Sequence, residues 1–146
     1  MMKKVIITGH GNYATGLKSS LDLLAGSNED VIAIDFPAEL NEQGLMKRMM
    51  DTVETFSDFE FLFICDILGG TPYKNAAVLA NTNHRLEVVA GCNLGSILEG
   101  ILQKDMMSLD ELAEAMVNSS RKYTVKFERI IESAAFDGGI TEEDGI

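Results

Sequence analysis

The chain has few of the residues that metal sites and disulfide frameworks need. It contains two cysteines and two histidines in 146 residues. Cys65 and Cys92 lack a C-x-x-C or other paired spacing, so we expect two reduced, buried thiols rather than a disulfide. Because these four residues stand at unrelated spacings, neither a structural nor a catalytic zinc site is expected.

Long apolar runs and basic residues are also scarce. No stretch approaches the roughly 18 apolar residues of a membrane span, and the first apolar run is far too short for a signal peptide. Twelve lysines and arginines against 23 acids give a formal net charge of −11. Nucleic-acid binding needs a basic face, so this balance argues against it. We expect a cytoplasmic protein without direct membrane insertion and without a nucleic-acid partner.

Several familiar catalytic motifs are missing. The sequence has neither G-x-x-x-x-G-K-[ST] nor G-x-G-x-x-G, so nucleotide binding by either loop is unsupported and no cofactor is expected. Ser19, Ser20 and Ser96 lack the context of a nucleophile elbow, which leaves a serine hydrolase without support. His84 lies in the polar stretch 81–85, where we expect it to be solvated.

The chain does contain apolar strand patterns that alternate with amphipathic helix patterns. Strands are predicted for the run from Lys3 that stops at His10 and for residues 30–36, 60–66 and 86–91. Helices are predicted for residues 13–24, 41–56, 71–83, 94–102 and from 108 through about 116. This alternation predicts an α/β fold with three layers, α/β/α, and a mainly parallel sheet. We take the strand order of this sheet to be 2-1-3-4.

The C-terminal part of the sequence is harder to interpret. Residues 122–130 alternate polar and apolar side chains, which fits either a half-exposed strand or a continuation of the preceding helix. Residues 137–146 include two adjacent glycines and several acids, and we expect an acidic, flexible tail there. No linker divides the chain, so residues 1–136 are predicted to form a single domain.

The strand ends hold the residues best suited to chemistry. His10 stands between two glycines at the end of the first strand, and Asp66 ends the third. In the order 2-1-3-4 these two strands are neighbours, and their carboxyl ends form the switch point where open α/β sheets bind ligands. A carboxylate there can accept the Nδ1–H of the imidazole, which leaves Nε2 exposed and nucleophilic. Taken alone, Asp66 could equally cap the turn after its strand.

An anion-binding turn follows Asp66. Gly69 and Gly70 can present backbone N–H groups, and a helix is predicted to begin at Thr71, which would cap it, with Pro72 in the first turn. The glycine pair could equally be no more than a tight connection between strand and helix. Together, the imidazole, its carboxylate and the anion-binding turn suggest a histidine that carries a phosphoryl group.

Four segments carry a resemblance to a known family. They are Thr8-Gly9-His10-Gly11, Asp35-Phe36, the run from Asp66 to Pro72 with Asn75, and Ala90-Gly91-Cys92-Asn93-Leu94. With these, the sequence resembles the enzyme IIA domain of the mannose-type (mannose/fructose/sorbose) sugar phosphotransferase system, which uses phosphoenolpyruvate. The resemblance covers roughly residues 3–120.

This resemblance implies a phosphoryl relay. The carrier HPr would donate to His10, and His10 would pass the group to a histidine of the cognate IIB protein, which serves the membrane IIC/IID transporter. Asp66 would orient His10, while Gly69, Gly70 and Thr71 would meet the phosphoryl oxygens. The family also implies a homodimer in which a C-terminal antiparallel edge strand, here 122–130, is exchanged.

Two other functions remain open from the sequence. The phosphotransferase-like subunit of dihydroxyacetone kinase shares the fold and uses a similar histidine, so it is the nearest rival within the resemblance. A non-catalytic small-anion sensor would keep the crevice without ever carrying a covalent phosphate. The sugar cannot be named from this chain, because in such a relay the membrane component recognises it.

Overall fold

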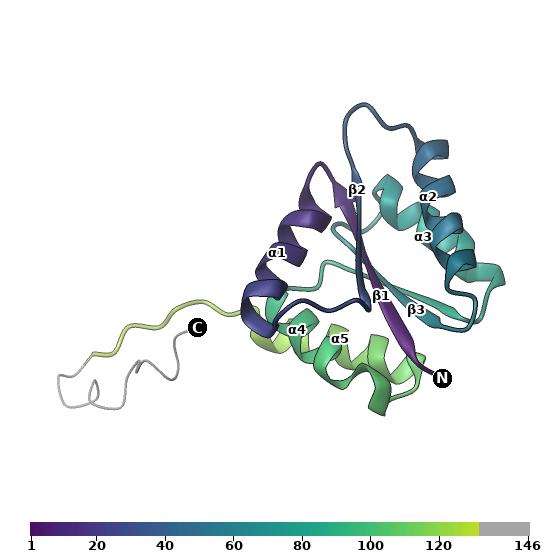
Figure 1. Cartoon of the computed structure of the whole chain (residues 1–146). Coiled ribbons are helices and arrows are strands. Elements are labelled where there is room, and N and C mark those ends of the chain that lie inside the picture. The colour runs from purple at the N-terminus through teal and green to yellow at the C-terminus, as the bar shows by residue number, and fades with distance from the viewer. Residues whose placement is uncertain (132–146) are drawn as a thin grey trace.

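Four parallel strands in the order β2-β1-β3-β4 form the sheet of this computed structural model, which describes residues 1–131. Each neighbouring pair is parallel, as predicted. The strands are β1 (Lys3–His10), β2 (Val31–Phe36), β3 (Glu60–Cys65) and β4 (Leu86–Ala90). Because β1 and β3 occupy the middle of the sheet, their carboxyl ends lie beside each other (Figure 1).

The central strands are covered on both faces. Val5, Ile6 and Ile7 have no exposed surface, and neither has any residue from Phe61 to Cys65. Apolar side chains on both sides of a strand are typical of parallel sheets, which helices cover from above and below. Burial of each large side chain contributes about 1.5–3 kcal/mol. β1, which ends at His10, and β3, which ends directly before Asp66, are therefore held firmly in the core.

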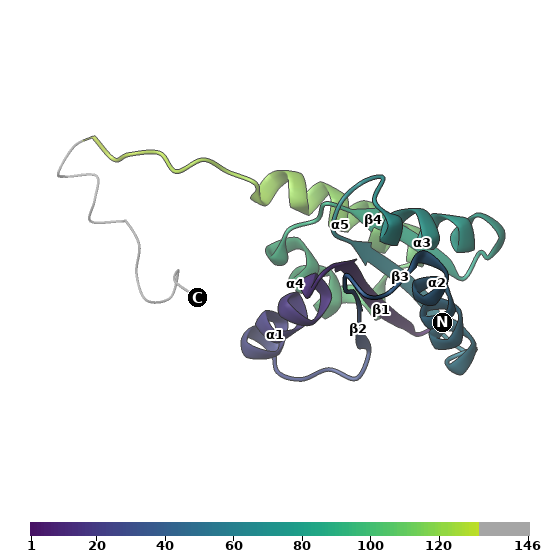
Figure 2. The same cartoon turned by 90° about the horizontal axis from the view of Figure 1, so that it is seen from above.

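Helices form the two outer layers (Figures 1 and 2). One face of the sheet packs against α1 (Tyr13–Ala25), α4 (Leu94–Gln103) and α5 (Leu109–Tyr123). The other face packs against α2 (Glu42–Thr55) and α3 (Thr71–Thr82). A short 3-10 helix, η1 (Lys104–Met106), links α4 to α5. The predicted three-layer α/β/α architecture is confirmed. No helix within residues 1–131 is long and apolar enough to cross a membrane.

The helices end and begin in different ways, and one predicted cap is wrong. Gly26 follows α1 with φ +81°, and Ser108 and Glu111 form a capping box at the start of α5. At α3, however, the cap is Gly70 and no side chain bonds to the helix end, while Thr71 is already the first helical residue. Pro72 lies in the first turn as predicted. The N-terminus of α3 is therefore capped by no side chain.

A cluster of buried charges, here called the amino-edge ion cluster, joins the start of the sheet to η1. Lys104 Nζ lies 2.8 Å from Asp30 Oδ2 and 2.7 Å from Asp105 Oδ2. Lys4 Nζ lies 3.1 Å from Asp30 Oδ1 and 4.4 Å from the ring centroid of Phe56. Both lysines are almost fully buried, so their positive charges need these partners.

Residues 124–131, which follow α5, lead away from the body of the protein (Figures 1 and 2). Helix α5 ends at Tyr123, and residues 124–131 form neither a helix nor a strand. The strand considered for 122–130 is thus absent from this single chain, and the helix covers only its first two residues. Val125 and Phe127 are largely exposed. The predicted tail over 137–146 lies outside the described residues, and the predicted domain 1–136 extends past them.

Candidate active site

The carboxyl edge of the sheet brings His10 and Asp66 together. Thr8 of β1 is paired with Cys65 of β3, so the residues that end the two strands lie side by side. His10 Nδ1 lies 2.8 Å from Asp66 Oδ2, and the backbone N–H of His10 donates to the same oxygen at 2.9 Å. The other oxygen, Oδ1, accepts from the N–H of Ile67 at 2.8 Å. The carboxylate is therefore fixed at both oxygens.

This geometry determines which nitrogen of the imidazole is available. With Asp66 accepting from Nδ1, the neutral ring carries its proton there, and Nε2 keeps its lone pair. The His10 side chain is 50% exposed, whereas that of Asp66 is 14% exposed. Burial alone would raise the pKa of the Asp66 carboxyl, but the hydrogen bonds from His10 and from the Ile67 N–H outweigh it and lower that pKa. Asp66 is therefore a carboxylate at neutral pH.

Two further neighbours confine the imidazole. A Cβ atom added to Gly70 would lie 2.8 Å from His10 Cε1 and 3.6 Å from Nε2, so only a glycine fits against this edge of the ring. On another side, the Phe36 ring meets the imidazole edge-on, with centroids 5.7 Å apart and an interplanar angle of 64°. The ring of His10 thus lies among groups from β2, β3 and the start of α3.

The start of α3 supplies groups suited to an anion. Gly69 has φ +82°, a conformation that favours glycine, and Gly70 precedes the first helical residue, Thr71. The first N–H groups of a helix have no partner within it, and the helix dipole adds positive potential there. Since Gly70 lies against the Cε1–Nε2 edge of His10, the N-terminus of α3 adjoins the available nitrogen.

Three residues to which the sequence pattern assigns no chemical role also belong to this edge. Asp35, at the end of β2, accepts from the N–H of Thr15 at 3.0 Å and from its hydroxyl at 2.6 Å. The Tyr13 ring packs next to Gly9 and Asp66, and burial together with the charge of Asp66 raises the pKa of the Tyr13 hydroxyl. The position of Asp35 beside Phe36 in a matched segment was the only signal for it.

The remaining candidate groups lie elsewhere. His84 is exposed in the connection between α3 and β4, at the opposite edge of the sheet. Both cysteines are buried and unpaired, and burial raises the pKa of Cys65 to about 12, so its thiol does not act as a nucleophile. Residues 1–131 contain no group of three or more His, Cys, Asp or Glu side chains arranged to hold a metal ion.

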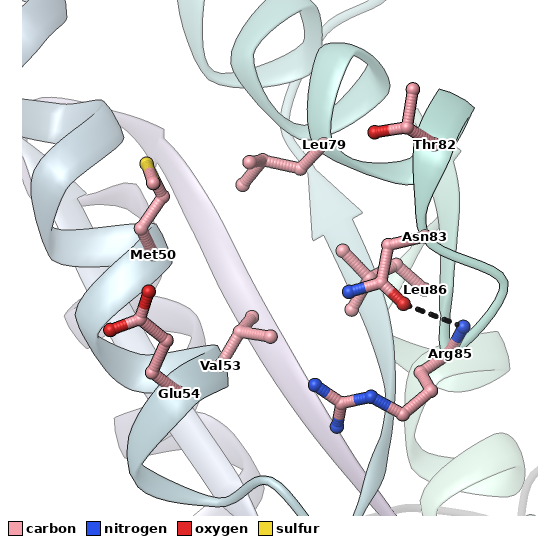
Figure 3. A pocket seen from close by; sticks show the side chains of 8 residues that line it. All are labelled: Met50, Val53, Glu54, Leu79, Thr82, Asn83, Arg85 and Leu86. Carbon is pink, nitrogen blue, oxygen red and sulfur yellow. Dashed lines mark hydrogen bonds between the residues drawn. The ribbon is translucent and has the colours of Figure 1, made fainter.

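A hollow between α2 and α3 is separate from this site (Figure 3). It has a volume of about 350 Å³, and Met50, Val53, Leu79 and Arg85 are among its lining residues. Arg85 precedes the first residue of β4, so the hollow adjoins the amino edge of the sheet. None of the predicted site residues lines it. The candidate catalytic residues therefore lie around His10 and not in this hollow.

Fold and site together define the class: an α/β protein with a parallel sheet and a histidine–carboxylate pair at its switch point. The EIIA-man family model, described as "PTS system fructose IIA component", matches residues 4–117. The chain therefore belongs to the IIA components of the mannose-type sugar phosphotransferase system, which supports a general role in phosphoryl transfer.

Individual relatives agree with this family. The chain is 33% identical over 112 residues to the fructose-specific EIIA component of Bacillus subtilis, covering 76% of this chain and 77% of that protein. It is 30% identical over 120 residues to the mannose-specific EIIAB component of Escherichia coli, covering 81% of this chain but 37% of that longer protein. It is 26% identical over 121 residues to a sorbose-specific EIIA component of Lacticaseibacillus casei, covering 83% and 88% of the two chains.

Solved structures share the fold. The EIIA component from Streptococcus agalactiae superposes with a TM-score of 0.79 at 33% identity, covering 86% of this chain and 97% of that one. The mannose/sorbose-specific IIA subunit from Enterococcus faecalis gives a TM-score of 0.84 at 24% identity, covering 91% and 100%. The second likeness bears on the fold alone.

Proposed function

We propose that His10 accepts a phosphoryl group from the phosphohistidine of HPr and passes it to a histidine of a cognate IIB protein. The observation that carries this proposal is the 2.8 Å contact between His10 Nδ1 and Asp66 Oδ2, because it leaves Nε2 as the attacking nitrogen. In each transfer the phosphorus–nitrogen bond of the donor breaks as a new one forms at the acceptor. No nucleotide takes part in the exchange.

The other predicted site residues would stabilise the negative charge of the phosphoryl group during its transfer. Gly69, Gly70 and Thr71 would meet the phosphoryl oxygens through backbone N–H groups and the Thr71 hydroxyl. Donors that are already in place stabilise charge at the moment of transfer without reorganisation. The carboxylate of Asp66 would stabilise the positive ring while the group arrives or departs. Catalysis would thus rest on positioning and electrostatics.

Incubation with phosphoenolpyruvate, enzyme I and HPr tests the proposal. We expect stoichiometric labelling of the protein, with the lability to acid and stability to base that a phosphohistidine shows. An unlabelled wild-type protein would contradict the relay and favour a small-anion sensor. Label that passes to a dihydroxyacetone kinase but not to a IIB protein would assign the chain to that kinase system instead.

The orienting role of Asp66 is tested by Asp66→Asn. The amide keeps the shape of the side chain but loses its charge, and its oxygen can satisfy fewer of the bonds from His10 and Ile67. Because the imidazole would then adopt other tautomers and orientations, we expect transfer to slow by roughly 10- to 100-fold. Rapid-quench labelling measures the rate, and ¹⁵N NMR of His10 reports the tautomer. A variant with the wild-type rate and tautomer would contradict the role.

We also propose that the protein forms a homodimer through the segment after α5. Residues 124–131 are exposed, and Val125, Phe127 and Ile131 are 79%, 71% and 91% exposed in the single chain. β4 is an edge strand that such a segment from a second chain could extend. Light scattering is expected to give twice the chain mass of 15.9 kDa, and a chain ended after Tyr123 is expected to be monomeric. A full-length monomer would contradict the exchange.

A further inference from the structure

Two helices begin beside His10, and either could attract an anion. Helix α1 starts at Tyr13, three residues after His10, and α3 starts at Thr71, next to the glycine that touches the imidazole. The N-terminus of any helix presents N–H donors and positive potential. An anion at this edge of the sheet therefore meets two helix ends, and the structure treats these two ends differently.

The N-terminus of α1 is partly covered by a side chain from outside the helix. Its own cap residue, Asn12, makes no side-chain hydrogen bond to the helix end. Instead the carboxylate of Asp35 on β2 accepts from the N–H of Thr15 at 3.0 Å and from the Thr15 hydroxyl at 2.6 Å. A negative group thus already occupies the third N–H of this helix. By contrast, the cap of α3 is a glycine, with no side chain to compete for its donors.

The backbone holds Asp35 in this place. The N–H of Gly11 donates to the carbonyl of Phe36 at 2.8 Å, so the end of β2 is tied to the turn directly after His10. In the sheet, Gly9 is paired with Asp35 and His10 with Phe36. The carboxylate therefore approaches α1 from a rigid strand end rather than from a loop.

Building on the proposed function, we propose that Asp35 is a positioning residue that closes the N-terminus of α1 to the phosphoryl group. Its oxygens take the Thr15 donors, and its charge repels a second anion there. The N-terminus of α3, on the Cε1–Nε2 edge of His10, is then the helix end that receives the phosphoryl oxygens. Asp35 acts through α1 and makes no contact with the reacting atoms.

Titration of the ¹⁵N-labelled protein with inorganic phosphate tests this role. In the wild type we expect the amide signals of Thr71 and Tyr73 to shift and those of Ala14 and Thr15 to stay unchanged. In Asp35→Ala, both sets of amides should shift with saturation, because the α1 donors are exposed. Asp35→Ser, whose shorter side chain withdraws from Thr15 but remains polar, serves as a second opening variant if the alanine variant folds poorly.

The matched control is Asp35→Asn. Its Oδ1 can still accept from the Thr15 N–H, so the α1 amides should remain unchanged at phosphate concentrations that shift them in Asp35→Ala. If the alanine and serine variants both show shifts confined to α3, as in the wild type, the closing role of Asp35 is overturned. Shifts confined to α1 in these variants would support that role but contradict the phosphoryl site at α3, so the two failures are distinguishable.

Discussion

Replacement of His10 by alanine is expected to abolish phosphoryl labelling completely. The imidazole is the acceptor in the proposed relay, and no neighbouring group can replace it: Cys65 is buried with a pKa of about 12, and the carboxylate of Asp66 is held by hydrogen bonds at both oxygens. The fold should survive, because the His10 side chain is half exposed. The expected loss is therefore chemical rather than structural.

His84→Ala is the matched control for this experiment. It removes the other histidine of the chain, which is exposed at the opposite edge of the sheet. Both variants are incubated with phosphoenolpyruvate, enzyme I and HPr, and circular dichroism checks that each is folded. We expect full labelling of His84→Ala and none of His10→Ala. Equal labelling of the two variants would place the acceptor elsewhere and contradict the proposed function.

Gly70→Ala is expected to reduce the rate of transfer by roughly 100-fold, the scale of loss that follows when a reacting group is displaced by about 1 Å. The added methyl would lie 2.8 Å from His10 Cε1, closer than real Cβ atoms come, and 3.0 Å from Ile67 Cγ2, which is tighter than most such contacts. Either the imidazole or the turn after Asp66 must move. The backbone is not the reason, because Gly70 has φ −73°, which alanine readily adopts.

Gly16→Ala makes the same chemical change where there is room. A Cβ atom at Gly16 meets nothing within 4 Å, and alanine is favoured over glycine inside a helix such as α1 by about 0.8–1 kcal/mol. This variant should transfer at the wild-type rate and unfold at a slightly higher temperature. Single-turnover labelling compares the two variants. A wild-type rate in Gly70→Ala would show that the close contact with the imidazole is without consequence.

The parallel sheet was predictable from the chemical signature of each strand, whereas the order 2-1-3-4 was a hypothesis that the structure confirms. The run Val5-Ile6-Ile7 and the continuous apolar run of β3 required burial on both faces, and the intervening amphipathic helices required parallel crossovers. Given that order, the meeting of His10 and Asp66 follows from the parallel direction of β1 and β3. These features depend on residue patterns within one element or between neighbours.

Other features depend on contacts that the linear pattern does not contain. The bond between Asp35 and Thr15 arises because β2 ends beside the start of α1, and no local motif marks it. Thr71 was predicted to cap α3 from its residue type, but Gly70 occupies the cap position and Thr71 is already the first helical residue, followed by Pro72. Alternation over 122–130 could not yield a strand in a single chain, because a strand also needs a partner.

The amino-edge ion cluster has a consequence for acid and base behaviour. Burial alone would raise the pKa values of Asp30 and Asp105, but Lys104, together with Lys4 at Asp30 and the Lys3 N–H at Asp105, outweighs it and lowers both pKa values below the ordinary value of 3.8. Burial alone would lower the pKa of Lys104, but its two carboxylate partners raise it above the ordinary value of 10.5.

The stabilisation from these carboxylates is thus present above pH 3.8 and lost as the pH falls through their lower folded pKa values. The stabilisation from Lys104 is present below pH 10.5 and is lost as the pH rises through the higher pKa that Lys104 has in the folded protein. Across the neutral range Asp30, Asp105 and Lys104 therefore keep their charges. A change in phosphoryl transfer between these limits would therefore not come from a weakening of this ionic anchor.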